Sequence, residues 1–229
     1  MSEWKRCNNF MNINPIVKIP AEEQATNALR EFIVSGQIPQ GTRITEAVLS
    51  EKLNLSRSTV RTALHLLTRE GLVRLKPYSG WMITMLTEKD IWELCTLRSA
   101  IERLGARLAA EFIDTDNNSE KLQLAFKHFT QTCASNDYAT IAESDLGLHE
   151  VIIGISGNRR LQEQYDLIKR QTLLFIRSSN DLIPDSGEIL NQHKPIVEAI
   201  LSGDIELAGR LSEEHNIEEG KKLISSIAL

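Results

Sequence analysis

The chain has 229 residues, of which 41% are hydrophobic and 25% are charged, and its net charge is −5. This is the composition of a globular protein with one large domain or two modest ones. Its apolar runs fall far short of the ~20 residues that a membrane span needs, and no secretory signal is visible at its start, so we expect a cytoplasmic protein.

The charge is unevenly distributed. Residues 1–84 carry eleven basic and seven acidic side chains, whereas residues 85–229 carry fifteen basic and twenty-four acidic ones. A cationic segment joined to an acidic remainder is typical of a small DNA-binding module with a partner domain of another function. Chance variation in surface charge would give the same pattern, so the charge alone does not decide between the two.

The start of the chain changes from an irregular segment to a helical one. Residues 1–20 have no clear period and contain Pro15 and Pro20, so we predict an extended arm there. A helix is predicted next, ended by Gly36. Its apolar face is expected to hold Ala25, Ala28, Leu29, Phe32 and Ile33.

Two further helices and a hairpin follow. Thr45 can cap a short helix with Val48, Leu49 and Leu53 pointing inward, and Ser56 can cap a third helix that runs to about Glu70. Asn54 can adopt the left-handed turn between them. Residues 72–75 and 81–84 are short strand candidates on either side of a turn. Three helices followed by a hairpin predict a winged helix-turn-helix domain over residues 21–84.

The rest of the chain is predicted to be helical throughout. Thr87 and Asp90 have the spacing of a capping box at its start, and no strand signal follows. The predicted helices cover residues 88–112, 118–134, 138–155, 158–180, 187–202 and 204–226. The fold class is therefore mostly α, with a six-helix antiparallel bundle over residues 88–229. Cys95 and Cys133 lie within these helical patterns and are expected to be reduced core residues.

The third helix has the residues of a DNA-reading helix. If Val60, Ala63, Leu64 and Leu67 face inward, then Arg57, Ser58, Arg61 and His65 face solvent. In a helix-turn-helix the start of this helix enters the major groove, where arginine can bind guanine through two acceptors and serine can reach bases or phosphates. Arg43 is placed to touch the DNA backbone. Two arginines on a solvated helix face are common, so this pattern alone is weak.

The same stretch resembles the GntR family of bacterial transcription regulators. The matching features are Gly41-x-Arg43-Ile44, Leu49-Ser-x-x-Leu53, Ser56-Arg-x-x-Val-Arg-x-Ala-Leu64, Glu70-Gly-Leu-Val73 and Gly80. The resemblance implies binding to double-stranded operator DNA. It implies that the residues facing bases or phosphates follow Ser56 at the start of the helix and that Gly80 lies at the wing tip. These facing residues are Arg57, Ser58, Thr59 and Arg61, and Ser56 is a DNA-binding candidate beside them. The chain departs from the family pattern at Ala47, Thr59 and Thr62.

Four residues of the helical part could hold a metal ion. Asp145 and His149 are four residues apart and project from one helix face, and His193 and His215 lie in the two last helices. One carboxylate with three imidazoles is a credible site for zinc, nickel or manganese. Any one of these histidines is more often an ordinary core or surface residue, and spacing cannot show that three helices converge.

The helical part resembles the FCD ligand-binding domain of the FadR subfamily. The matching stretches are Leu97-Arg-x-x-Ile-Glu102 with Leu108-Ala-Ala110, Asp145-Leu-Gly-Leu-His149 with Gly157-Asn158, residues 193–204, and Glu214-His215. Six helices suggest the VanR-type branch. The resemblance implies that Asp145, His149, His193 and His215 hold a divalent metal and that a small carboxylate effector binds there. Arg98 is the candidate partner of that carboxylate, although it could instead pair with Glu102.

Three functions remain open on these grounds. The first is an effector-responsive regulator, most simply a repressor, that binds a pseudo-palindromic operator as a homodimer. The second is a metal-dependent hydrolase or lyase that uses the same Asp/His site, since an open metal can activate water. The third is a DNA-binding protein with a structural metal. The basic winged helix favours a regulator, and no H-E-x-x-H motif supplies a catalytic base.

Overall fold

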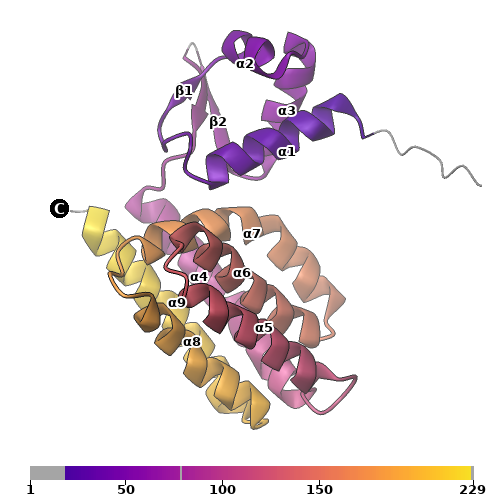
Figure 1. Ribbon diagram of the computed structural model, residues 1–229, viewed down its shortest axis with the longest axis vertical. Helices are drawn as coiled ribbons and strands as arrows, with labels where there is room; N and C mark the ends of the chain where they lie inside the picture. Colours follow the sequence, from indigo (N-terminus) through magenta and orange to yellow (C-terminus); the bar gives the residue numbers. More distant parts are fainter. Residues whose placement is uncertain (1–18, 78, 228–229) are drawn as a thin grey trace, which may run out of the picture.

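The computed structural model describes residues 19–77 and 79–227. Nearly all of the arm predicted over residues 1–20 lies outside the described residues. The described chain is mostly helical, with a small winged part above a larger helical bundle (Figure 1). The predicted fold class is therefore confirmed. Among the described residues, no helix is long and apolar enough to cross a membrane.

The winged part combines three helices with a three-stranded sheet. The helices are α1 (Ala21–Val34), α2 (Glu46–Leu53) and α3 (Arg57–Arg69), and the strands are β1 (Arg43–Ile44), β2 (Val73–Lys76) and β3 (Gly80–Ile83). The strand order is β1-β3-β2 and both pairings are antiparallel, with Trp81 opposite both Ile44 and Leu75. The two-residue strand β1 was not predicted, because so short a segment has no readable alternation.

Local signals fix the ends of α2 and α3 as predicted. Thr45 Oγ1 accepts a hydrogen bond from the Val48 N–H at 3.3 Å, and Ser56 Oγ accepts one from the Thr59 N–H at 3.1 Å. Asn54 has a φ of 51°, in the left-handed region. These three residues turn the chain sharply between the two helices, so α3 takes the position of a recognition helix.

The inward face of α3 is confirmed, but two predicted core positions are wrong. The stripe of α3 is completely buried, and it consists of Val60, Ala63, Leu64 and Leu67. Val48 is 51% exposed and Phe32 is 46% exposed. In α1 the buried face instead includes Thr26 and Val34, so Phe32 falls on its flank.

The bundle contains the six predicted helices, with ends within a residue of those expected. They are α4 (Glu88–Glu111), α5 (Asn118–Cys133), α6 (Tyr138–Ile155), α7 (Arg159–Asn180), α8 (Ser186–Leu201) and α9 (Ile205–Ile227). The capping box at Thr87 and Asp90 is present. The axes of α4 and α9 lie so close that a Cβ added at Gly220 would be 2.5 Å from Cys95 Sγ. Cys95 and Cys133 are buried free thiols, as predicted.

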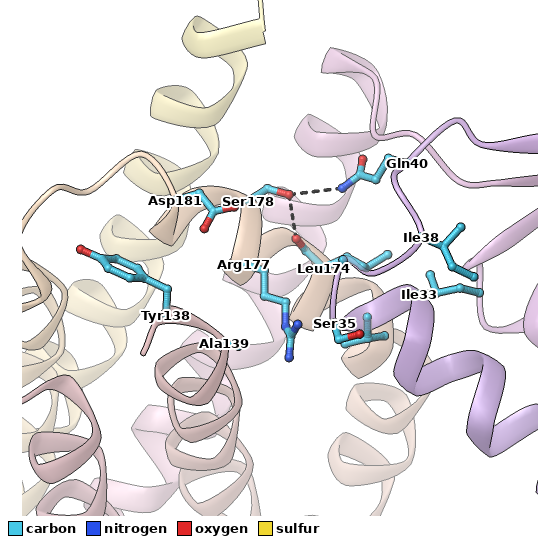
Figure 2. A pocket seen from close by; sticks show the side chains of 12 residues that line it. Ile33, Ser35, Ile38, Gln40, Tyr138, Ala139, Leu174, Arg177, Ser178 and Asp181 are labelled. Atoms are coloured by element: carbon cyan, nitrogen blue, oxygen red, sulfur yellow. Dashed lines mark hydrogen bonds between the residues drawn. The ribbon is translucent and has the colours of Figure 1, made fainter. Parts of the chain in front are cut away.

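The two parts of the molecule meet at α7 and at the start of α4. Gln40, in the loop after α1, donates a hydrogen bond through Nε2 to Ser178 Oγ at 3.4 Å, and Arg74 of β2 pairs with Asp90 of α4 at 3.0 Å. A cleft of about 180 Å³ opens between the end of α1 and helices α6 and α7 (Figure 2). Arg177 lines this cleft and pairs with Glu143 at 2.9 Å. The joint therefore has exposed polar contacts around an apolar centre, since buried residues of α1 and of α7 belong to one hydrophobic cluster.

Candidate nucleic-acid interface and metal centre

The start of α3 presents a cluster of hydroxyl groups beside an arginine. Ser56 Oγ lies 2.8 Å from the hydroxyl oxygens of both Ser58 and Thr59. Arg57 and Ser58 are exposed, and Thr59 is half-buried. The N-terminus of a helix attracts a phosphate through its free N–H groups and its dipole. Ser56 therefore shapes this end of the helix, where the side chains of Arg57 and Ser58 are exposed to solvent.

Arg61 lies on the same exposed face but already has a partner. Its Nε donates to Glu46 Oε1 at 2.8 Å and its Nη2 donates to Glu46 Oε2 at 2.7 Å. The Trp81 indole N–H donates to Glu46 Oε1 at 3.1 Å. These bonds lower the pKa of Glu46, with Arg61 as the main cause, so the carboxylate is ionised at neutral pH. One acidic side chain thus connects α2, α3 and the wing.

The remaining predicted DNA contacts lie near the wing. Arg43 is exposed on β1, opposite Met82 of β3. Gly80 begins β3 with a φ of 81°, a conformation that favours glycine. His65 is exposed and its ring packs edge-on against Trp81, with centroids 4.9 Å apart. The structure therefore gathers the DNA-contact candidates on α3 and on the sheet beside it.

The four predicted metal ligands come together from three helices of the bundle. Asp145 Oδ1 lies 3.3 Å from His149 Nε2 and 3.2 Å from His193 Nε2, and the two nitrogens are 3.3 Å apart. Ligand nitrogens of His149, His193 and His215 all lie within 4.8 Å of one another. Asp145, His149 and His193 are at most 3% exposed, and His215 is half-buried.

The outer ring nitrogens show that this cluster fits a cation. His149 Nδ1 lies 3.0 Å from Glu102 Oε2, and His193 Nδ1 lies 2.8 Å from the Ile189 carbonyl oxygen. When both Nδ1 atoms donate these bonds, both neutral rings present lone pairs at Nε2. Asp145 Oδ1 then faces two acceptors and has no hydrogen bond of its own. Converging lone pairs repel one another unless a positive charge lies between them, and outer partners of this kind are typical of metal-binding histidines.

The pKa values of His149 and His215 also indicate that the cluster favours one positive charge. Burial by itself lowers the pKa of His149, but the charges of Glu102 and Asp145 outweigh burial and raise that pKa to about 9. Burial and the neighbouring His193 and His149 lower the pKa of His215 well below its usual value. Without a metal, a proton on His149 therefore takes the place of the cation, whereas His215 keeps a free lone pair.

Arg98 is completely buried beside the centre and pairs with Glu102. Its Nε lies 3.0 Å from Glu102 Oε1, and its guanidinium carbon lies 5.2 Å from the Phe175 ring centroid. The pair with Glu102, one of the two roles considered for Arg98, is therefore present. Arg98 Nη1 has no hydrogen-bond partner. Tyr165, Asn216 and Glu219 also have buried polar atoms that lack a hydrogen-bond partner.

A groove between α8 and α9 leads from the surface toward the centre. Its volume is about 200 Å³, and His215 and Glu219 line it together with Gln192 and Lys222. Burial raises the pKa of Glu219, and the negative charge of Asp145 raises it further. The groove gives small molecules a path to the half-buried edge of the histidine cluster.

Sequence reasoning missed several residues of both sites. It gave Glu46 no role in the DNA-binding site, and it did not connect Glu102 with His149. Asn216, whose Nδ2 donates to Glu102 Oε2 at 2.8 Å, follows His215 directly and was also missed. Glu219 is four residues after His215, a spacing that could have indicated a shared helix face. His128 is exposed on α5 and lies outside the cluster.

Comparisons with known proteins match both parts of the chain to known families. The model of the FCD domain matches residues 93–218, and the model described as bacterial regulatory proteins, gntR family, matches residues 21–83. The chain is 28% identical over 193 residues to the "Probable D-xylose utilization operon transcriptional repressor" of Paenarthrobacter nicotinovorans, covering 82% of this chain and 83% of the relative. It is also 28% identical over 181 residues to the gluconate operon transcriptional repressor of Bacillus subtilis strain 168, covering 77% of this chain and 74% of that relative.

Two solved structures share the fold. A transcriptional regulator described as GntR from Rhodococcus sp. RHA1 has a TM-score of 0.74 at 23% identity, covering 90% of this chain and 98% of the other. E. coli McbR/YncC has a TM-score of 0.72 at 18% identity, covering 92% of this chain and 100% of the other. At these identities the likeness concerns the arrangement of helices and strands.

Proposed function

The chain belongs to the GntR family of bacterial regulatory proteins, with an FCD domain as its C-terminal part, and from this membership we propose that it is a repressor that binds a pseudo-palindromic operator as a homodimer. It is a DNA-binding transcription regulator and not an enzyme, since both matching families are regulators. The hydrolase or lyase alternative finds no support among its relatives. The two relatives described above are both named as operon repressors, which supports the sign of regulation proposed here.

The exposed face of α3 carries the DNA-binding part of the proposal. Arg57 and Ser58 stand at its free N-terminal end, where a recognition helix enters the major groove. One such helix reads too few bases for useful specificity, and a two-fold dimer doubles the contacts. We therefore expect two half-sites of inverted sequence.

Selection from duplexes with a randomised core tests this proposal directly. The parent protein should enrich an inverted repeat, and Arg57→Ala should weaken binding to the enriched duplex by roughly 1–3 kcal/mol. Arg69, at the far end of α3, provides a matched control, because Arg69→Ala removes the same charge away from the reading end. If the parent enriches no sequence, or if Arg57→Ala binds like the parent, then α3 does not read DNA.

The centre of Asp145, His149, His193 and His215 is proposed to hold a divalent transition metal. The single observation that carries this is the convergence of buried lone pairs described above. Zinc, nickel and manganese all suit a set of imidazoles and a carboxylate. A bound ion would supply a Lewis-acidic anchor for an anion. Elemental analysis of protein purified without chelators should therefore find about one such ion per chain.

A small carboxylate is proposed as the effector, held at this centre with the help of Arg98. Arg98 Nη1 is a buried donor without a partner, and a carboxylate would satisfy it. One relative is named for the gluconate operon, and gluconate is a carboxylate. A thermal-shift screen of small acids on metal-loaded protein tests this, with Arg98→Gln as the variant that keeps a polar side chain but loses the charge. If no acid stabilises the parent, or if the variant responds like the parent, this effector class is wrong.

A further inference from the structure

Glu46 occupies an unusual position for an acidic residue of a DNA-binding module. It is the first residue of α2, and both of its carboxylate oxygens are bound to Arg61 of α3. The Trp81 indole N–H holds one of these oxygens from the wing side. Trp81 is itself only 4% exposed, with His65 packed against it. The carboxylate is therefore fixed by a rigid neighbour as well as by the arginine.

The pattern of bonds leaves a defined part of Arg61 free. A guanidinium has five N–H donors. Glu46 accepts from the single N–H of Nε and from one of the two N–H groups of Nη2. Both hydrogens of Nη1 and the second hydrogen of Nη2 remain. One hydrogen of each of these two nitrogens points outward, and this pair forms the outer edge of the fork. Since the Arg61 side chain is 59% exposed, this edge has access to solvent. Two parallel donors at such an edge match the O6 and N7 acceptors of guanine.

An unrestrained arginine next to DNA has many competing partners. It can rotate toward the nearest phosphate, which carries no sequence information. Holding the guanidinium in one orientation beforehand removes that freedom and reduces the entropy lost when the base contact forms. Glu46 also repels phosphates, because it brings a negative charge to the same place.

We propose that Glu46 is a positioning residue for sequence reading, which holds the free edge of Arg61 outward so that Arg61 recognises guanine in each half-site. Glu46 itself touches no base in this scheme. The opposite possibility is that Glu46 withholds Arg61 from DNA, in which case removing its charge would strengthen specific binding. The two possibilities differ in sign, so one set of variants separates them.

The experiment uses the full-length protein and two duplex probes. The first probe is the sequence that the parent protein enriches from duplexes with a randomised core. The second is a series of the same duplex, each member with one base changed in one half-site. Glu46→Gln removes the negative charge and leaves one acceptor oxygen, so the two-bond grip on Arg61 is lost. The matched control is Glu51→Gln, which removes an equal charge from an exposed position on the same helix.

We expect Glu46→Gln to reduce the preference for guanine at one position per half-site by about tenfold, within the range of a single two-bond base contact. Glu51→Gln should keep the full preference, because any gain from its lost charge applies equally to all sequences. Arg61→Lys, which keeps the charge but has no fork, should lose the preference at the same position as Glu46→Gln. In an Arg61→Ala background, Glu46→Gln should change base preference by less than about twofold, because its effect acts through Arg61.

Three results would overturn the proposal. Unchanged base preference in Glu46→Gln would show that Arg61 needs no support. Tighter specific binding by Glu46→Gln would identify Glu46 as a latch instead. An undiminished effect of Glu46→Gln without Arg61 would show that it acts through another group. Thermal melting followed by circular dichroism identifies any variant that is unfolded, and Arg61→Lys then still tests the base contact independently of Glu46.

Discussion

His149 and His193 show how the outer nitrogen of a ring determines what its inner nitrogen can do. Glu102 and the Ile189 carbonyl oxygen occupy the outer nitrogens, so the inner ones converge on Asp145. The sequence allowed us to predict the pairing of Asp145 with His149, because residues four apart share a helix face. It could not reveal Glu102, which reaches His149 only through the packing of α4 against α6. Nor could spacing show that Arg98 Nη1 would be left without a partner.

Removing the metal should destabilise the bundle. If an ion binds only the folded form, a hundredfold excess over its Kd stabilises that form by about 3 kcal/mol. Treatment with a chelator should therefore lower the melting temperature, and His193→Ala should make the protein insensitive to both metal and chelator. His128→Ala is the matched control, because His128 is exposed on α5 and should leave the metal response intact. A parent protein that gains no stability from zinc, nickel or manganese would contradict the site.

At the scale of helices and strands, capping and turn residues gave the best prediction of where each helix begins and ends. Thr45, Asn54 and Ser56 fixed the ends of α2 and α3 because each acts on backbone groups next to it. The exposed side of a short helix is harder to predict. α2 has eight residues and packs mainly through Leu49, so Val48 is left exposed although it is as apolar as its neighbours. Burial there depends on where α3 lies, which no local pattern encodes.

Replacing two glycines with different backbone conformations by alanine should change the free energy of unfolding in opposite directions. Gly71 follows α3 with a φ of 73°, and its N–H donates to the Thr68 carbonyl oxygen at 3.0 Å, so Gly71→Ala should cost about 1 kcal/mol of unfolding free energy. Gly147 lies inside α6 with nothing within 4 Å of an added Cβ. Gly147→Ala should therefore stabilise the protein by roughly 0.5–1 kcal/mol. Urea titration of both variants checks the signs, and equal signs would contradict this account of the two backbones.

At the scale of the whole molecule, α4 offers a surface for the proposed dimer. Leu97 is 47% exposed and Leu104 is 41% exposed, and their spacing of seven residues places them on one face of the helix. A second copy of the chain is the partner that the proposed two-fold symmetry of the operator requires. Leu104→Arg should give a monomer in sedimentation and lose binding to the selected duplex. Leu124→Arg changes a residue on α5 that is 59% exposed, and it should remain dimeric. A dimeric Leu104→Arg variant would place the interface elsewhere.

Effector and operator should influence each other equally, because coupling between two binding sites is reciprocal. α7 is the element placed to carry this coupling. Its buried residues Thr172 and Phe175 lie in the bundle, and Phe175 contacts Arg98, whereas Ser178 meets Gln40 of the winged part. Calorimetry with an acid found in the thermal-shift screen should show that operator DNA changes its affinity. Ser178→Ala should reduce that change, and identical acid affinity with and without operator would exclude direct coupling.

The joint between the two parts also limits which DNA-binding parts this bundle can accept. The polar contacts between the two parts include Gln40 with Ser178 and Arg74 with Asp90, and neither is deeply buried. A recombined DNA-binding part would have to match an apolar surface as well, because one hydrophobic cluster includes Leu29 and Ile33 of α1 and Leu174 of α7. A DNA-binding part grafted from a relative onto this bundle should therefore fold when its face toward α7 is equally apolar. In such chimeras, transcription from a promoter with a known operator would show which small molecules the bundle binds.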